Sequence, residues 1–169
     1  MVCLGDFFDK DVLSGEELTA LQEVKWYGVP HHFVVGNHEM SSSDLSKSSQ
    51  HIMQLMPNVV VHDCPDMIED DAGNSLCFLP YQLNENVRLI DQYFPTTSNR
   101  IVFSHNNLKG VQMGKFLSDE GLDIQDISNG CELFINGHFH NAGVVANGVW
   151  NVGTINVILR NAEGTFTHL

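Results

Sequence analysis

Short apolar runs alternate along the chain with stretches that carry helix signals. Val2 to Leu4 is an apolar run that ends in Gly5-Asp6, which predicts a short strand followed by a loop. Ser14 and Glu17 have the spacing of a capping box, so a helix is expected from Ser14 to about Tyr27. The first part of the chain therefore has the pattern of a strand followed by a helix.

The alternation continues toward the middle of the chain. Further strands are predicted at the apolar runs His32 to Val35, Asn58 to His62, Arg100 to Phe103 and Cys131 to Ile135. Further helices are predicted from Ser43 or Asp44 to Met56, where Pro57 stops the pattern, and from Asn84 to Phe94.

Hairpin signals appear beside these elements. Met67-Ile68 and Leu76 to Leu79 flank a turn-like acidic segment, and Asn147-Gly148 separates two apolar runs, a strong sign of a tight hairpin. Two closing strands are expected at Asn156 to Leu159 and Thr165 to His168. Alternating strands and helices followed by hairpins favour an α/β fold with two packed mixed sheets flanked by helices.

Length and composition fit one soluble domain over residues 1–169. The chain is 43% hydrophobic and 17% charged, and no apolar run approaches the roughly 20 residues of a membrane-spanning helix. The N-terminus lacks the pattern of a signal peptide. The four cysteines form no Cys-x-x-Cys pair, so reduced thiols in a cytoplasmic protein are expected.

The charge is strongly acidic, with a formal net charge of −13. Such a field repels phosphate backbones at long range, so contact with nucleic acid would have to be local, helped by metal ions or made by another chain. The simpler interpretation is that the acidic residues keep a small domain soluble. The nine histidines are many for this length and direct attention to metal binding.

Polar segments that suit metal binding follow four of the predicted strands. They are Gly5-Asp6-Phe-Phe-Asp9, Gly36-Asn37-His38-Glu39, Ser104-His105 and Gly137-His138-Phe-His140. Strands of one sheet can bring their carboxyl ends to a common rim, where ligands usually bind. Each segment alone has an ordinary explanation as a turn or a surface histidine, whereas the four in this order favour one site.

The chemistry of such a rim would be that of a metal centre. An Asp carboxylate can bridge two divalent ions, and histidine nitrogens with an Asn carbonyl oxygen make a mixed donor set that suits Mn, Fe or Zn better than Ca or Mg. Two ions would clamp a phosphate and activate a bridging water. His38 stands next to a candidate ligand and could protonate the leaving oxygen.

These four segments resemble motifs of the calcineurin-like metallophosphoesterases, and the resemblance extends from about Leu4 to Thr154. It implies a four-layer sandwich and a site with two metal ions, most naturally Mn. Asp6 would bridge both ions, His140 would belong to the first site, and three further residues would complete the second, namely Asn37, His105 and His138. His38 would be the catalytic histidine, with Asp9 orienting it.

Within the family, three stretches are most similar to the SbcD-type DNA-repair nucleases. They are Gly5-Asp-Phe-Phe-Asp9, Phe134-Ile-Asn-Gly-His-Phe-His140 and Asn151-Val-Gly-Thr154. This resemblance implies a DNA phosphodiesterase, with DNA and an SbcC-type ATPase subunit as partners of the full-length protein.

The sequence departs from the family at its first motif, because no Asp-x-His segment precedes Gly5-Asp6. The first metal site would retain only Asp6 and His140, so only one ion is expected for this chain alone. We expect the motif and a central strand to lie upstream in a longer protein, or on another chain, which includes a homodimer. The loop from Asn106 to Phe116 holds Lys109 and Lys115, which could touch a substrate phosphate or simply be solvated.

Three functions remain open from the sequence. The first is metal-dependent hydrolysis of DNA phosphodiesters. The second is a phosphatase or phosphodiesterase for small molecules, which the acidic charge would suit better. The third is a truncated, non-catalytic binding module, against which the retained His38 argues weakly.

Overall fold

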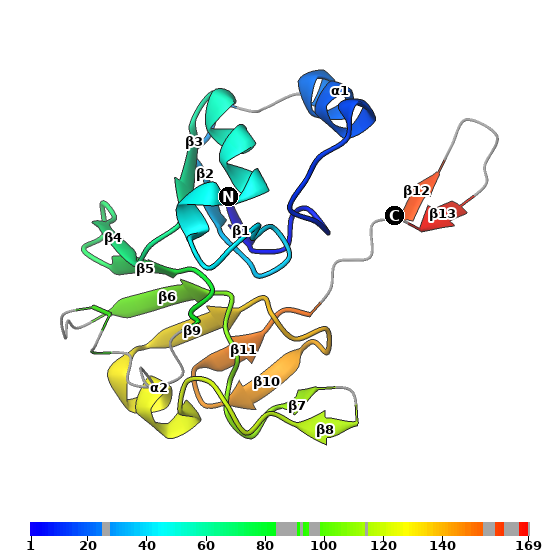
Figure 1. The fold of residues 1–169 in the computed structure, drawn as a ribbon. Helices are drawn as coiled ribbons and strands as arrows, with labels where there is room; N and C mark the ends of the chain where they lie inside the picture. The colour runs from blue at the N-terminus through cyan, green and yellow to red at the C-terminus, as the bar shows by residue number, and fades with distance from the viewer. Residues whose placement is uncertain are drawn as a thin grey trace.

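The computed structural model describes residues 1–24, 28–83, 91, 93–94, 99–113, 115–153, 158–160 and 166–168. Two β-sheets form the body of the chain, a three-stranded sheet above a six-stranded one in Figure 1. This α/β architecture with two sheets and few helices confirms the predicted fold class. Among the described residues, no helix is long and apolar enough to cross a bilayer.

The smaller sheet is parallel throughout, whereas a mixed sheet was expected. It has the order β1-β2-β3, formed by β1 (Val2–Leu4), β2 (His31–Val34) and β3 (Val59–His62). Of the described strands, only β2 pairs with β1. A further strand on the outer edge of β1 therefore stays a prediction.

Helix α1 (Gly15–Glu23) connects β1 to β2 and begins with the predicted capping box. The Ser14 side chain accepts a hydrogen bond from the Glu17 N–H, and the Glu17 carboxylate accepts one from the Ser14 N–H at 2.7 Å. The helix ends at Glu23 because Val24 is extended, so the predicted extension toward Tyr27 was too long, and residues 25–27 lie outside the described part.

The predicted helix from Ser43 or Asp44 to Met56 is wrong in type. Two 3-10 helices occupy this segment, η1 (Leu45–Lys47) and η2 (Ser49–Leu55). Ser48 between them is extended, with φ −73° and ψ 143°, and its hydroxyl accepts a hydrogen bond from the Gln50 N–H. Serine and aspartate side chains compete in this way for backbone donors, and they break one α-helix into two short turns.

The larger sheet is mixed, as predicted, and has the order β10-β11-β9-β6-β5-β4. Its central pairs, β5–β6, β6–β9 and β9–β11, are parallel, and the two outer pairs are antiparallel hairpins. The strands are β4 (Asp66–Glu69), β5 (Ser75–Leu79), β6 (Arg100–Ser104), β9 (Leu133–Asn136), β10 (Gly143–Ala146) and β11 (Val149–Asn151). Both hairpins expected from the sequence are present.

Several smaller elements were not predicted or differ from expectation. Helix α2 (Ile124–Gly130) and the ribbon of β7 (Gln112–Met113) and β8 (Phe116–Leu117) precede β9 and had no clear signal. The closing strands β12 (Ile158–Arg160) and β13 (Phe166–His168) pair with each other and extend neither main sheet. Most of the predicted helix from Asn84 to Phe94 lies outside the described residues.

Each sheet has its own apolar core. Phe33, Met53 and Leu21 are buried against the three-stranded sheet, whereas Phe134, Val102 and Ile127 are buried against the six-stranded sheet. These rigid layers hold the carboxyl ends of the strands β1, β2, β6 and β9 in place, and the loops that follow those four strands carry the candidate site.

Candidate metal centre

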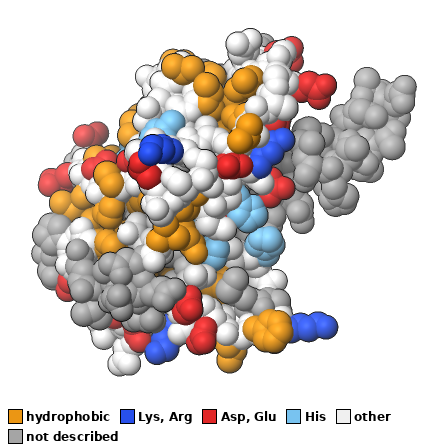
Figure 2. Space-filling view, viewed as in Figure 1, with side chains coloured by type: hydrophobic (Ala, Val, Ile, Leu, Met, Phe, Trp, Pro, Cys, Tyr) orange, Lys and Arg blue, Asp and Glu red, His pale blue; other side chains and the backbone are white. Residues whose placement is uncertain are grey.

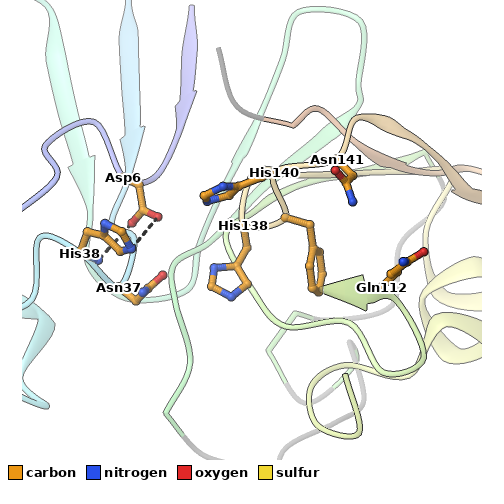
Figure 3. Close-up of a pocket in the computed structure, with 8 residues that line it drawn as sticks. Asp6, Asn37, His38, Gln112, His138, His140 and Asn141 are labelled. Atoms are coloured by element: carbon orange, nitrogen blue, oxygen red, sulfur yellow. Dashed lines mark hydrogen bonds and ion pairs between the residues drawn. The ribbon is translucent and has the colours of Figure 1, made fainter. Parts of the chain in front are cut away.

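Three of the four polar segments predicted from the sequence line one cavity of about 390 Å³ (Figure 3), and the fourth places His105 in contact with Asp6, Asn37 and His138 of that lining. Each follows the carboxyl end of a parallel strand, β1, β2, β6 or β9, and this is why segments far apart in the chain converge. The lining comprises Asp6, Asn37, His38, Gln112, His138, Phe139, His140 and Asn141.

Three donor atoms surround Nε2 of His105, whose side chain is buried. Its Nε2 atom lies 3.1 Å from Oδ2 of Asp6, 3.1 Å from Oδ1 of Asn37 and 3.0 Å from Nδ1 of His138. The structure thus brings together the four residues that the family resemblance assigns to the second metal site.

The backbone of β1 fixes which nitrogen of His105 faces the cluster. Nδ1 of His105 lies 2.5 Å from the carbonyl oxygen of Leu4, so it donates its hydrogen there. The other ring nitrogen, Nε2, is then the one that points toward Asp6 and Asn37. A carbonyl that orients a histidine ligand in this way is a frequent feature of metal sites.

The spacing and chemistry of these donors fit a divalent ion. Ligands in adjacent positions on an ion at about 2.1 Å lie about 3 Å apart, which matches the observed separations of 3.0 and 3.1 Å. Two imidazole nitrogens, one carboxylate oxygen and one amide oxygen suit Mn, Fe or Zn. Because the ring hydrogen of neutral His105 is on Nδ1, Nε2 and the facing oxygens of Asp6 and Asn37 are all acceptors, and a cation would satisfy their lone pairs together.

The electrostatics hold two of these residues in the form that binds metal. Burial favours protonation of Asp6, but the hydrogen bond and charge of His105 outweigh it and lower the pKa of the Asp6 carboxyl. Burial, together with neighbouring His105, lowers the pKa of His138 to about 4. At neutral pH, Asp6 is therefore a carboxylate and His138 a neutral imidazole, which are their ligand forms.

His140 lies in the same cavity but outside this tight cluster. Its side chain is exposed, and in Figure 3 it points into the space beside Asp6. Asp6, His105 and His138 have ligand atoms within 4.8 Å of one another, and among the described residues His140 does not join that group. The assignment of His140 to a different ion from His105 stays a prediction.

His38 stands at the mouth of the cavity and contacts Asp9. Nδ1 of His38 is 2.9 Å from Oδ1 of Asp9, and Nε2 is 3.9 Å from Oδ2 of Asp6. Partial burial lowers the pKa of His38, but the hydrogen bond to Asp9 and the charge of Asp6 outweigh it, so the net pKa is raised. The structure thus places Asp9 against His38, with the Asp9 side chain 97% exposed, and the orienting role that the family resemblance implies stays a prediction.

Glu39 is a supporting residue that the sequence analysis did not single out. Its buried carboxylate accepts hydrogen bonds from the N–H groups of Asp6, Phe8 and Gly36, each at 3.1 Å. It thereby ties the loop after β1 to the loop after β2. Its position directly after Gly36-Asn37-His38 was the available signal.

Three buried asparagines support the other side of the centre, and they too were missed. The Asn136 amide bonds to the backbone of Asn106 and to the Asn151 side chain, at 2.9–3.4 Å. Nδ2 of Asn151 donates to the carbonyl oxygens of Phe139 at 2.5 Å and Asn141 at 2.7 Å. These bonds fix the segment that carries His138 and His140.

His51 and His62 lie away from the candidate centre. His51 pairs with Asp63 at 3.2 Å, and His62 pairs with Asp66 at 3.0 Å. Neither lines the cavity, and among the described residues neither belongs to a cluster of three metal-ligating side chains. They provide no substitute for the absent Asp-x-His motif.

Comparison with known proteins identifies the family. The family model for calcineurin-like phosphoesterases matches residues 1–142, which include every residue of the cluster. No curated protein matches the chain.

Proposed function

Since the chain belongs to the calcineurin-like phosphoesterase family, we propose that it hydrolyses phosphodiesters at the Asp6–Asn37–His105–His138 centre. The observation that carries the proposal is that Asp6, Asn37 and His138 line one cavity with His38, while His105 contacts all three of these donors from the buried side. Metal ligands alone would suit a storage or structural site. A histidine that has its own carboxylate partner and faces the same cavity adds the means for proton transfer.

Asp6, Asn37, His105 and His138 would hold one divalent ion, and Asp6 with His140 would contribute to a second. Mn is the ion we propose, with Fe or Zn as alternatives. Bound ions would supply Lewis-acid stabilisation and a nucleophilic water. Glu39 and the three buried asparagines hold the loops that carry the ligands in position. Little reorganisation of these loops is therefore needed when substrate binds.

His38 is the residue we assign to the leaving group. The raised pKa favours the protonated imidazole, and Nδ1 contacts the Asp9 carboxylate, so Nε2 faces the cavity. His38 would donate that proton to the departing oxygen as the ester bond breaks. General acid catalysis of this kind contributes about 10²- to 10⁴-fold.

DNA is the substrate that the resemblance to SbcD-type nucleases favours. The net charge of −13 favours the second candidate, a small phosphodiester, because a long polyanion is repelled by most of this surface. Both candidates share the same bond cleavage, so the first experiment addresses that bond.

The test is hydrolysis of bis-p-nitrophenyl phosphate after loading with Mn²⁺. We expect turnover by the wild-type chain, a loss of about 10²-fold or more in His38→Ala with unchanged metal content, and loss of both metal and turnover in Asp6→Ala. His51→Ala is the matched control, because His51 pairs with Asp63 away from the cavity.

The proposal predicts that the two variants differ. Equal metal loss in His38→Ala and Asp6→Ala would refute the division of roles. A metal-loaded wild-type chain without turnover would favour the non-catalytic binding module.

A further inference from the structure

The loop after β5 also reaches the metal centre, although the sequence analysis gave it no role. β5 is parallel to β6, with Leu79 paired to Ser104, so the carboxyl ends of both strands lie at the same rim of the larger sheet. Tyr81 follows the end of β5 by two residues, and its side chain is partly buried. A fifth strand end therefore contributes a side chain to this rim.

This loop is hydrogen-bonded to both sheets. The N–H of Tyr81 donates to the carbonyl oxygen of Val35, which follows β2 of the smaller sheet, at 2.9 Å. The carbonyl oxygen of Leu79 accepts a hydrogen bond from the N–H of His105 at 3.2 Å. The loop thus connects the two halves of the molecule, and Figure 2 shows histidine side chains at the surface where these halves meet.

Asn106 fixes the same loop from the side of β6. Its buried side chain donates from Nδ2 to the carbonyl oxygens of Leu79 at 3.2 Å and Pro80 at 2.9 Å. Its Oδ1 accepts a hydrogen bond from the N–H of Gln82 at 2.8 Å. These bonds hold the backbone on both sides of Tyr81. Asn106 directly follows His105, so one short segment carries a metal ligand and anchors the Tyr81 loop.

The ring of Tyr81 lies against the two histidines of the centre. Its centroid is 5.6 Å from that of His138, with the ring planes at 45°, and 6.5 Å from that of His105, with the planes at 62°. Both distances lie in the range of about 4.5–7 Å in which aromatic rings stabilise one another. The two imidazoles are 4.9 Å apart, so the three rings form one cluster. Phe139, by contrast, contacts the ring of His138.

We propose that Tyr81 is a positioning residue, whose ring holds the imidazoles of His105 and His138 in the orientation that binds the ion. Nε2 of His105 and Nδ1 of His138 are 3.0 Å apart, and side-chain rotations that the neighbouring ring restricts would change this separation. Tyr81 is not among the residues that line the cavity, so it acts through the ligands and not on the substrate. The ring carries this role and the hydroxyl does not. The inference rests on the proposed metal centre and extends the set of residues that maintain it.

The test compares Mn²⁺ binding by the wild type, Tyr81→Leu and Tyr81→Phe in calorimetric titrations. Leucine retains apolar bulk but has no ring, so binding should weaken about 10-fold, the size of effect expected when a group that orients ligands is lost. Phenylalanine retains the ring, so affinity should stay within about 2-fold of the wild type.

Tyr93→Leu is the matched control for the loss of a tyrosine ring. Tyr93 is also partly buried, but it packs against the apolar core of the larger sheet and beside Phe94. Its replacement should leave Mn²⁺ affinity unchanged. Urea unfolding of each variant verifies that the chain is folded under the conditions of the titration, so that a loss confined to Tyr81→Leu does not come from unfolding.

A second readout reports on the ligands directly. Co²⁺ bound in place of Mn²⁺ has visible absorption bands that depend on the identity and geometry of its ligands. Tyr81→Leu should change the position or intensity of these bands, whereas Tyr81→Phe and Tyr93→Leu should reproduce the wild-type spectrum.

Equal Mn²⁺ affinity and identical Co²⁺ spectra in the wild type and Tyr81→Leu would overturn the inference and leave the proposed function standing. The same loss in Tyr81→Phe or Tyr93→Leu would also overturn it, because the hydroxyl or general stability would then be responsible. A wild-type chain that binds no Mn²⁺ would overturn the inference and the metal centre together. Neither readout requires turnover, so a chain that binds Mn²⁺ without hydrolysing the diester refutes the proposed activity alone.

Discussion

At the scale of single residues, the metal centre depends on a close approach that only glycine permits. Gly5 has a φ of +82°, and a Cβ atom there would lie 2.3 Å from Nδ1 of His105. His105 in turn hydrogen-bonds the Leu4 carbonyl, so the loop after β1 and the loop after β6 fit together at this point. A methyl group at Gly5 would push the imidazole away from Asp6 and Asn37.

Gly5→Ala should therefore weaken Mn²⁺ binding by about 10-fold or more, the size of effect seen when a group that orients a ligand is lost. Gly15→Ala is the control, because no atom lies within 4 Å of a Cβ at this helical position. Calorimetric titration with Mn²⁺ measures both. Equal affinity in the two variants would mean that His105 tolerates displacement.

Asn151 is the second residue whose role is local and testable. Its amide group donates to the carbonyl oxygens on either side of His140, and it is 3% exposed. Asn151→Ala leaves those carbonyls without their donor, which should lower the free energy of unfolding by about 1–3 kcal/mol. We also expect weaker Mn²⁺ binding, about 10-fold, since the segment that carries His138 and His140 loses its anchor. Urea unfolding and calorimetry measure the two effects, and unchanged metal affinity would reduce Asn151 to a purely structural role.

At the scale of elements, a histidine pair links the two sheets away from the metal centre. Nδ1 of His32 lies 3.0 Å from Nε2 of His62, and Nδ1 of His62 lies 3.0 Å from the Asp66 carboxylate. The His62 ring stacks on Phe78 of the larger sheet, with ring centroids 3.9 Å apart. Burial lowers the pKa of both histidines, so the neutral pair is the form that the fold stabilises.

This arrangement predicts acid-sensitive stability. The folded pKa of His62 lies below its unfolded value near 6.5, so the unfolded chain binds more protons between those two values. The free energy of unfolding should fall as the pH drops below about 6.5, by at most about 1.4 kcal/mol per pH unit for one histidine. Asp66 and Asp63 raise the pKa of His62 and so moderate the effect, whereas His32 lowers that pKa further and strengthens it.

The measurement is urea unfolding from pH 5 to 8 of the wild type and of His62→Phe, which keeps the aromatic stack and removes the titrating group. The variant should show a smaller slope with pH, and contributions from other groups cancel in the comparison. Identical slopes would show that His62 does not contribute to the pH dependence of the free energy of unfolding.

The elements also show what the sequence can and cannot reveal. Strands such as Val59–His62 and the Asn147-Gly148 hairpin were predictable because each depends on local apolar runs and turn chemistry. The 3-10 turns around Ser48 were not, because side-chain competition for backbone donors leaves the helical pattern intact in the sequence. Helix α2 is short and has a weak pattern of apolar residues, so the sequence does not reveal it. The packing of Ile127 in the core stabilises it.

The candidate centre was predictable to a similar degree. Asp6, Asn37, His38, His105 and His138 each follow a strand in a recognisable order, and the structure brings four of them to one cavity with His105 in contact behind it. Glu39, Asn136 and Asn151 act through hydrogen bonds between segments distant in sequence, and such bonds have no local signature.

At the scale of the whole molecule, the charge of −13 should govern how polyanions approach. Repulsion at long range is screened by salt, with a Debye length of about 10 Å at 0.1 M. Raising NaCl from 20 to 200 mM should therefore increase kcat/KM for pentathymidylate several-fold relative to bis-p-nitrophenyl phosphate, which carries one charge. A decrease instead would show that the field of Lys109, Lys115 and the bound ions dominates.

The central claim is that Asp6, Asn37, His105 and His138 hold a divalent ion that makes this chain a phosphoesterase. The most direct test is the Mn content per chain after loading and desalting, measured for the wild type and His105→Ala, with bis-p-nitrophenyl phosphate hydrolysis followed in the same samples. The account predicts at least one ion per wild-type chain together with turnover, and loss of both in His105→Ala. A wild-type chain that retains no stoichiometric ion, or one that hydrolyses the diester equally well without His105, would contradict it.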